Sequence, residues 1–269
     1  MIRLSRRALL GATAALALAA TLPSTVNAQG TPLRVGVTAG PHAQILEVVA
    51  RVAARDGLQI KAVEFSDYIQ PNAALSTGDL DANSYQHQPF LDQQVKDRGY
   101  KLVSVAKTVI FPMGIYSQKI KSIAELPEGG RIGIPNDPTN GGRALAVLAK
   151  AGAFQLREGL DFRATVADIV QNPKRLRVVE IDAAQIPRAL PDLDAAAINT
   201  NYALPAGLNP VRDAIAVESS ESPYANLIAV REQDRARPEI VKLVKAYHSD
   251  EVKRFIQETF QGSVVPAWQ

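Results

Sequence analysis

Short apolar runs alternate with segments of helical period along the first part of the chain. Residues 33–39, LRVGVTA, form an apolar run that predicts a buried strand, and residues 43–54 repeat apolar positions at helical spacing. The alternation continues with further strands and helices, which we expect at residues 58–65, 71–76, 79–85, 89–98 and 101–110. Such a β-α-β-α-β order predicts a mainly parallel sheet covered by helices.

A second series of strands and helices follows and ends in a helical tail. We expect its strands at residues 114–118, 131–135, 178–182 and 194–199, with helices beginning near residues 143 and 184. The chain closes with a strongly helical segment over residues 238–260. The pattern therefore predicts an α/β protein of two lobes, with the tail packed on the first lobe. Open α/β sheets bind ligands beyond the carboxyl ends of their strands, so candidate site residues are expected there.

Residues 1–28 have the pattern of an export signal. Three arginines precede an apolar stretch over residues 8–22, and the small residues at positions 26–28 predict cleavage after Ala28. The adjacent Arg6 and Arg7 resemble a twin-arginine signal, and an ordinary secretory signal with two neighbouring arginines is the alternative. The apolar stretch is shorter than the roughly 20 residues that span a bilayer, which argues against a membrane helix.

Removal of the predicted signal changes the charge of the protein. Without 28 of its 269 residues the chain keeps 241, enough for one large or two modest domains. The full chain has 30 lysines and arginines against 27 acidic residues, and the three signal arginines account for the whole excess. The exported protein is therefore near neutral, which argues against nucleic acid as a partner. The sequence contains no cysteine, so the core must hold the fold without disulfides.

Residues 66–94 gather aromatic and amide side chains around a predicted strand end. The segment contains Tyr68, Tyr85, His87 and Phe90. Aromatic residues with polar tips suit a pocket that encloses an apolar group and fixes its orientation. The alternative is that the rings cap the sheet and the amides satisfy turns. His87 is more simply explained as a hydrogen-bonding group than as a metal ligand, and we expect no metal and no other cofactor.

Residues 134–150, IPNDPTNGGRALAVLAK, predict a strand end, a turn and a helix that carries Arg143 in its first turn. Thr139 or Asn140 can cap this helix, whose unpaired N–H groups favour an anion. Because Arg143 adds positive charge at the same place, we infer a site that holds a small anion by charge-assisted hydrogen bonds. The alternative is a surface ion pair between Arg143 and a nearby acid. A phosphate site is less favoured, since the glycine-rich nucleotide motifs and the P-loop lysine are missing.

Asparagines recur beside two later apolar runs. Asn199 and Asn201 follow the run at residues 194–198, and Tyr224 and Asn226 introduce the next buried run. An asparagine can accept from an ammonium group through its oxygen or donate to a carboxylate through its nitrogen. Turn formation is the alternative for each asparagine taken alone. The recurrence of four polar clusters at strand ends favours a ligand site.

Four segments carry a resemblance to a known family. They read FSDYIQPNAALSTGDLDANSYQHQPFLDQQVKDRGYKLV, IPNDPTNGGRAL, INTNYA and ESPYANLI. In order, spacing and length they resemble the methionine-binding substrate-binding proteins of ABC importers, the NlpA lipoprotein family. The similarity extends from Leu33 to about Trp268. It implies a two-lobed periplasmic-binding-protein fold, similar to type II, with a ligand cleft between the lobes. We expect residues 29–110 and 205–269 in lobe 1 and residues 111–204 in lobe 2.

The resemblance also implies a role for eight residues. Arg143 would clamp the α-carboxylate of methionine, with Asn140 beside it. The rest of the head group would be bound by Asn199 and Asn226. A slot for the thioether would be formed by Tyr68, Tyr85, His87 and Tyr116.

The resemblance implies a monomeric periplasmic protein, not an enzyme, that delivers D- or L-methionine to an inner-membrane permease and its ATPase. Family members carry a lipidated cysteine after the leader, and its absence implies a free periplasmic protein or one held by an uncleaved leader. Another small amino acid, a methionine derivative or a methionyl dipeptide is the alternative ligand. A periplasmic enzyme is a remote alternative, because no Gly-x-Ser-x-Gly, cysteine nucleophile or His-Glu metal motif occurs. An adhesive or structural envelope protein is a third alternative for the function.

Overall fold

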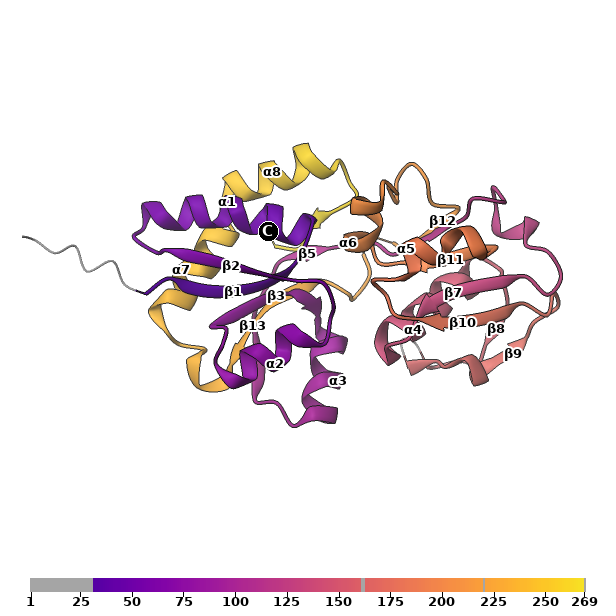
Figure 1. Ribbon diagram of the computed structural model, residues 1–269, viewed down its shortest axis with the longest axis horizontal. Helices are drawn as coiled ribbons and strands as arrows, with labels where there is room; N and C mark the ends of the chain where they lie inside the picture. Colours follow the sequence, from indigo (N-terminus) through magenta and orange to yellow (C-terminus); the bar gives the residue numbers. More distant parts are fainter. Residues whose placement is uncertain (1–30, 161–162, 220, 269) are drawn as a thin grey trace, which may run out of the picture. The chain divides into compact units, whose positions relative to one another are not determined.

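Two five-stranded sheets organise the protein in a computed structural model that describes residues 31–160, 163–219 and 221–268 (Figure 1). The predicted export signal at residues 1–28 lies outside the described residues. The first sheet has the strand order β2-β1-β3-β13-β4 and the second has the order β10-β7-β11-β6-β12. We call the part built on the first sheet lobe 1 and the part built on the second sheet lobe 2.

The first sheet is parallel at one side and is completed by a strand from late in the chain. Its strands are β1 (Leu33–Thr38), β2 (Ile60–Phe65), β3 (Ala82–His87), β4 (Leu102–Lys107) and β13 (Asn226–Arg231). Strand β1 pairs parallel with both β2 and β3, as the sequence pattern predicts. Strand β13 lies between β3 and β4 and pairs antiparallel with both.

Helices cover both faces of the first sheet, as Figure 1 shows. They are α1 (Pro41–Arg55), α2 (Gln70–Thr77), α3 (Gln88–Arg98), α7 (Pro238–Tyr247) and α8 (Asp250–Phe260). Ile228 of β13 packs with α1, α7 and α8, whereas the adjacent Leu227 packs with α2 and α3 on the other face. This alternation is what a strand buried on both sides requires. The helical tail thus packs on lobe 1.

Lobe 2 is built in the same way on smaller elements. Its sheet contains β6 (Gly114–Tyr116), β7 (Arg131–Pro135), β10 (Arg177–Ile181), β11 (Ala195–Ile198) and β12 (Ala216–Val217). Strand β7 pairs parallel with β10 and β11, and β6 pairs antiparallel with β11 and β12. Helix α4 (Pro138–Lys150) packs on one face, and the short helix α5 (Ile186–Ala189) packs on the other. Helix α6 (Thr200–Ala203) follows β11 directly.

Short strand pairs complete the described part of the fold. Strand β5 (Val109–Ile110) pairs with β14 (Val265–Pro266), and β8 (Gln155–Leu156) pairs with β9 (Ile169–Gln171). Among the described residues, no helix is both long and apolar enough to cross a membrane.

The chain passes twice between the two lobes. It leaves lobe 1 after β5 and enters lobe 2 at β6, close to the change that we expect at residue 111. It returns between β12 and β13, because Ala216 and Val217 pair with β6 in the second sheet. The second crossover therefore lies after Val217, later than the boundary expected at residue 205. A strand of two residues gives no alternating pattern from which its sheet could be recognised.

Candidate functional site

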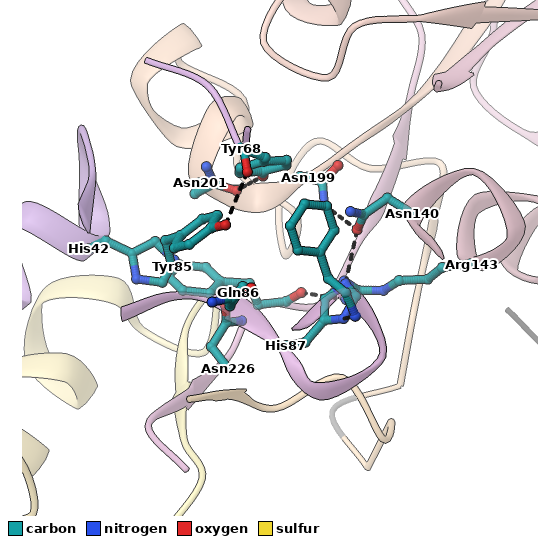
Figure 2. A pocket seen from close by; sticks show the side chains of 12 residues that line it. His42, Tyr68, Tyr85, Gln86, His87, Asn140, Arg143, Asn199, Asn201 and Asn226 are labelled. Carbon is teal, nitrogen blue, oxygen red and sulfur yellow. Dashed lines mark hydrogen bonds between the residues drawn. The ribbon is translucent and has the colours of Figure 1, made fainter. Parts of the chain in front are cut away.

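A cavity lies between the two lobes and receives side chains from both (Figure 2). Its walls come from strand ends and helix starts, as the location of sites in open α/β sheets predicts. Lobe 1 contributes His42, Tyr68, Tyr85, Gln86, His87, Phe90 and Asn226, and lobe 2 contributes Asn140, Arg143, Asn199 and Asn201. Phe111, in the first crossover, completes the lining. In Figure 2, His42 and Arg143 lie at opposite ends of the cavity.

His87 ends β3 and is the N-cap residue of α3. Its Nδ1 accepts a hydrogen bond from the backbone N–H of Phe90 at 3.2 Å, so Nδ1 carries no proton. The proton of the neutral ring is therefore on Nε2, which donates to Oδ1 of Asn140 at 3.2 Å across the cavity. Burial, and secondarily the charge of Arg143, lowers the pKa of His87 to about 3. The imidazole is thus a neutral donor that connects the two lobes.

Asn140 lies at the centre of an amide network in the first turn of α4. Its Nδ2 donates to both carboxylate oxygens of Asp137 at 3.0 Å, which orients its Oδ1 toward His87 and Asn199. Asn199 Nδ2 donates to that oxygen at 2.9 Å. Asp137, rather than the expected Thr139 or Asn140, caps the helix by accepting from the Asn140 N–H. Burial raises the pKa of Asp137.

Arg143 lines the cavity and is almost fully buried. Its Nε donates to Oε1 of Glu218 at 3.0 Å, and its Nη2 donates to Oε2 of Glu218 and, at 2.8 Å, to the carbonyl of Phe111. The guanidinium carbon lies 4.4 Å from the ring centroid of Tyr224, a cation-π distance. Arg143 therefore has an acidic partner, as the alternative explanation required, but this pair is buried at the cavity instead of exposed on the surface.

The first turn of α4 comes close to β7 because residue 141 is glycine. A Cβ at Gly141 would lie 2.8 Å from the carbonyl oxygen of Pro135, closer than a real Cβ contact. The absence of a side chain lets the helix start beside the strand end. Asn140 and Arg143 are thereby placed at the cavity wall.

Aromatic rings form a second part of the lining, which we call the aromatic wall. Tyr68 lies 6.0 Å from Tyr85 and 5.9 Å from Phe90 between ring centroids, distances typical of aromatic pairs. The Tyr68 hydroxyl donates to Asn201 Oδ1 at 2.6 Å, and the Tyr85 hydroxyl donates to the Tyr68 carbonyl at 3.0 Å. Burial raises the pKa of Tyr68 and of Tyr85 well above the usual value, so both phenols stay neutral.

Tyr116 is the one expected site residue that the structure does not bring to the cavity. The other seven all line it. Tyr116 ends β6 and packs with Ile186, Leu190 and Ile198 in the core of lobe 2. Strand alternation explains this position, because Ile115 and Tyr116 face opposite sides of the sheet and both sides are covered. We therefore remove Tyr116 from the candidate thioether slot.

Three residues of the site were missed from the sequence, namely His42, Phe111 and Glu218. His42 follows the carboxyl end of β1, so the rule for open sheets could have found it. Its Nδ1 has no hydrogen-bond partner among the described residues, and burial lowers the pKa of His42 to about 3. Glu218 lies 75 residues from Arg143, and no local pattern connects them. Among the described residues, no group of three or more histidine, cysteine or acidic side chains is placed to hold a metal ion.

Two α/β lobes joined by two crossovers, with a buried polar cavity between them, define a two-lobed substrate-binding protein. The sequence model of the NlpA lipoprotein family matches residues 33–268. The chain belongs to this family.

Individual relatives agree with the family over most of their length. The chain is 49% identical to D-methionine-binding lipoprotein MetQ of Salmonella typhi over 239 residues, 88% of each chain. A solved nutrient-binding protein of Burkholderia cenocepacia, described as bound to methionine, is 55% identical with a TM-score of 0.86; the match covers 88% of this chain and 100% of that one. A periplasmic substrate-binding protein of an ABC transporter from Coxiella burnetii is 49% identical with a TM-score of 0.84, covering 87% and 100%. The expected fold is confirmed.

Proposed function

We propose that the protein is a substrate-binding protein that captures methionine and delivers it to an ABC-type importer. The main support is its 55% identity to a binding protein described as bound to methionine, across the whole of that chain. Relatives that are 49% identical carry the name D-methionine-binding lipoprotein. The protein works by binding and not by catalysis. Its partners are a permease and an ATPase, and it acts as a monomer in the periplasm after cleavage behind Ala28, without lipidation.

The cavity supports this ligand through its chemistry. A free amino acid carries two opposite charges, and each is costly to bury without a partner. Arg143 supplies a guanidinium for the carboxylate, and the oxygens of Asn199 and Asn226 supply acceptors for the ammonium group; Asn199 Oδ1 has no hydrogen-bond partner among the described residues.

The thioether of methionine suits the aromatic wall. Sulfur against an aromatic ring contributes roughly 0.3–1.5 kcal/mol per contact. Tyr68, Tyr85, His87 and Phe90 present such rings to the cavity. We assign these four residues to the side chain of the ligand.

Titration calorimetry with D- and L-methionine tests the function. The protein, purified from the envelope of producing cells and freed of bound small molecules, is expected to bind methionine more tightly than norleucine, which has the same shape without sulfur. Equal affinity for the two would contradict the assignment of the aromatic wall. Heat from neither methionine isomer would refute the proposed function.

Asn226→Ala tests the role of a single cavity amide in ligand binding. The structure gives the side-chain amide of Asn226 no hydrogen bond to the described residues, so its truncation breaks no hydrogen bond of the fold. We expect methionine affinity to fall by about 1.5–3 kcal/mol, the contribution of a hydrogen bond to a charged group, with an unchanged melting temperature. Gln233→Ala, an exposed amide outside the cavity, is the control. Wild-type affinity in Asn226→Ala would remove this residue from the site.

A further inference from the structure

Glu218 holds the edge of the Arg143 guanidinium that carries Nε and Nη2, and the Phe111 carbonyl accepts a second hydrogen bond from Nη2. The two side chains form a bidentate pair in which Arg143 is 3% exposed and Glu218 is 7% exposed. Such planar, paired contacts fix both position and orientation of a guanidinium. The remaining nitrogen, Nη1, makes no hydrogen bond to the residues that the structure describes. Nη1 is therefore the donor that stays available to a ligand.

Glu218 begins the second crossover and is itself held by the first. It follows β12, where its backbone N–H donates to the carbonyl of Met113 at 2.9 Å. Its Oε2 accepts from the Met113 N–H at 3.1 Å. Met113 lies in the first crossover, and so does Phe111, whose carbonyl accepts from Arg143. The carboxylate is thus fixed at the point where the two chain segments between the lobes run side by side.

The pair also decides the charge of the cavity. Glu218 balances Arg143, and His42 and His87 are neutral because burial lowers each pKa to about 3. Asp137, a half-buried carboxyl group nearby, is held by Asn140 and Thr139 at the start of α4. A ligand with both an ammonium and a carboxylate group keeps the charges of the cavity balanced. A ligand with only a carboxylate adds an uncompensated buried charge.

We propose that Glu218 is a positioning residue that makes the cavity selective for zwitterions, by directing Nη1 of Arg143 to the ligand and by cancelling the charge of the guanidinium. This inference rests on the proposed function, because it specifies how the same cavity chooses among methionine-like molecules. A carboxylate that lacks the amino group is the ligand against which Glu218 discriminates.

The test compares methionine with 4-(methylthio)butanoate, its analogue without the amino group. In the wild-type protein, methionine is expected to bind at least 100-fold more tightly. In Glu218→Gln the guanidinium charge is no longer cancelled, so methionine should bind more weakly and the analogue should bind more tightly. The ratio of the two affinities should therefore fall at least tenfold. Glu251→Gln, which removes the same charge from the exposed Arg55–Glu251 pair, should leave the preference unchanged.

A second variant separates charge from shape. Glu218→Asp keeps the negative charge but shortens the side chain, so it should weaken both ligands and preserve the preference for methionine. An unchanged preference in Glu218→Gln would overturn the proposal, as would an equal loss of preference in Glu218→Asp. If Glu218→Gln does not fold, the wild-type protein still provides a test. Wild-type affinities for methionine and for the analogue that lie within tenfold of each other would contradict the proposed selectivity. Wild-type protein that binds no methionine would instead refute the proposed function.

Discussion

Burial keeps the two histidines of the cavity uncharged. His87 and His42 each have a pKa lowered to about 3 by removal from water, whereas a histidine in the unfolded chain titrates near 6.5. Between these two values the unfolded chain binds protons that the folded protein does not bind. The free energy of unfolding therefore falls as the pH drops from about 6.5 toward 3. The neutral rings also leave the recognition of charge to Arg143, Glu218 and the amides.

Replacement of His87 by asparagine should weaken this pH dependence. Asparagine is a good N-cap residue, so α3 keeps a capping side chain in His87→Asn. We expect the free energy of unfolding to depend less on pH, by up to about 1.4 kcal/mol per pH unit between pH 6.5 and 4. Urea unfolding at several pH values, without ligand, measures the difference between variant and wild type. Because Asp137 titrates in both proteins, its opposite contribution cancels in that difference.

His248→Asn provides the matched control. His248 lies away from the cavity, stacked on Trp268 at 5.0 Å between ring centroids. A pH dependence that is the same in His87→Asn and in wild type would contradict a neutral, buried His87. A change of the same size in His248→Asn would show that the effect is not specific to the cavity.

The sequence identifies single residues well where local pattern and chemistry agree. His87 and Asn226 stand at the ends of buried strands, and Arg143 stands near the start of a helix, so all three could be placed at the sheet edge. Helix α4 begins at Pro138, earlier than expected, so Arg143 lies in its second turn and not in its first. Glu218 could not be predicted, because its role depends on a partner 75 residues away. The assignment of Tyr116 failed for a different reason, since a strand with both faces covered gives no sign of which face meets the cavity.

At the scale of elements, helix α4 positions the polar end of the cavity. Asp137 caps it, Gly141 lets it start against β7, and its first two turns then present Asn140 and Arg143. The same carboxylate that caps the backbone also accepts from the Asn140 side chain at 3.0 Å. Stability of the helix start and orientation of a cavity amide are thus coupled in one side chain.

Removal of this cap should reduce both stability and binding. In Asp137→Ala, the loss of the N-cap is expected to lower the free energy of unfolding by about 1–2 kcal/mol, and methionine affinity should fall because Asn140 is no longer oriented. Asp137→Asn keeps an oxygen acceptor for the backbone and should lose less than half as much stability. Urea unfolding and calorimetry measure the two quantities. Equal stability of Asp137→Ala and wild type would show that the cap does not hold the helix.

The strand and helix pattern predicted most elements but not all of their connections. Long elements such as β1, α1 and the tail helices have strong periodicity and were found near their observed positions. The insertion of β13 between β3 and β4 could not be predicted, since pairing between strands more than a hundred residues apart leaves no local signal. The second crossover lies later than the sequence predicts for a different reason, because β12 has only two residues and gives no alternating pattern.

At the scale of the whole molecule, hydrogen bonds connect the lobes across the cavity. Tyr68, after β2, donates to Asn201 of α6 at 2.6 Å, and His87 donates to Asn140 at 3.2 Å. The Tyr202 hydroxyl donates to the carbonyl of Ser66 at 3.2 Å. Two-lobed proteins commonly close around ligands by a hinge motion, and contacts of this kind favour the closed arrangement. The crossovers at residues 111–113 and 218–225 are the candidate hinges.

Loss of one hydroxyl that connects the lobes should shift the equilibrium from the closed toward the open arrangement. Tyr68→Phe keeps the ring in the aromatic wall and removes only the hydrogen bond to Asn201. We expect methionine affinity to fall about 3–10-fold, the value of one hydrogen bond, and the radius of gyration without ligand to increase. Small-angle scattering with and without methionine measures the shift.

Tyr100→Phe is the control, because Tyr100 packs in lobe 1 with its hydroxyl outside these bridges. An unchanged radius of gyration in Tyr68→Phe, together with wild-type affinity, would show that the bridge does not favour closure. A change in Tyr100→Phe as large as in Tyr68→Phe would point to a general effect on stability.

The position of β13 determines the order in which the lobes can be finished during synthesis. Every strand of the second sheet precedes residue 218, and its first and last strands, β6 and β12, pair with each other. In the first sheet, β3 and β4 are joined through β13, so this sheet is incomplete until residues 226–231 leave the ribosome. Domains generally fold as units while the chain emerges. The lobe that comes second in the sequence therefore can fold first, whereas the lobe that begins the chain must wait for its end.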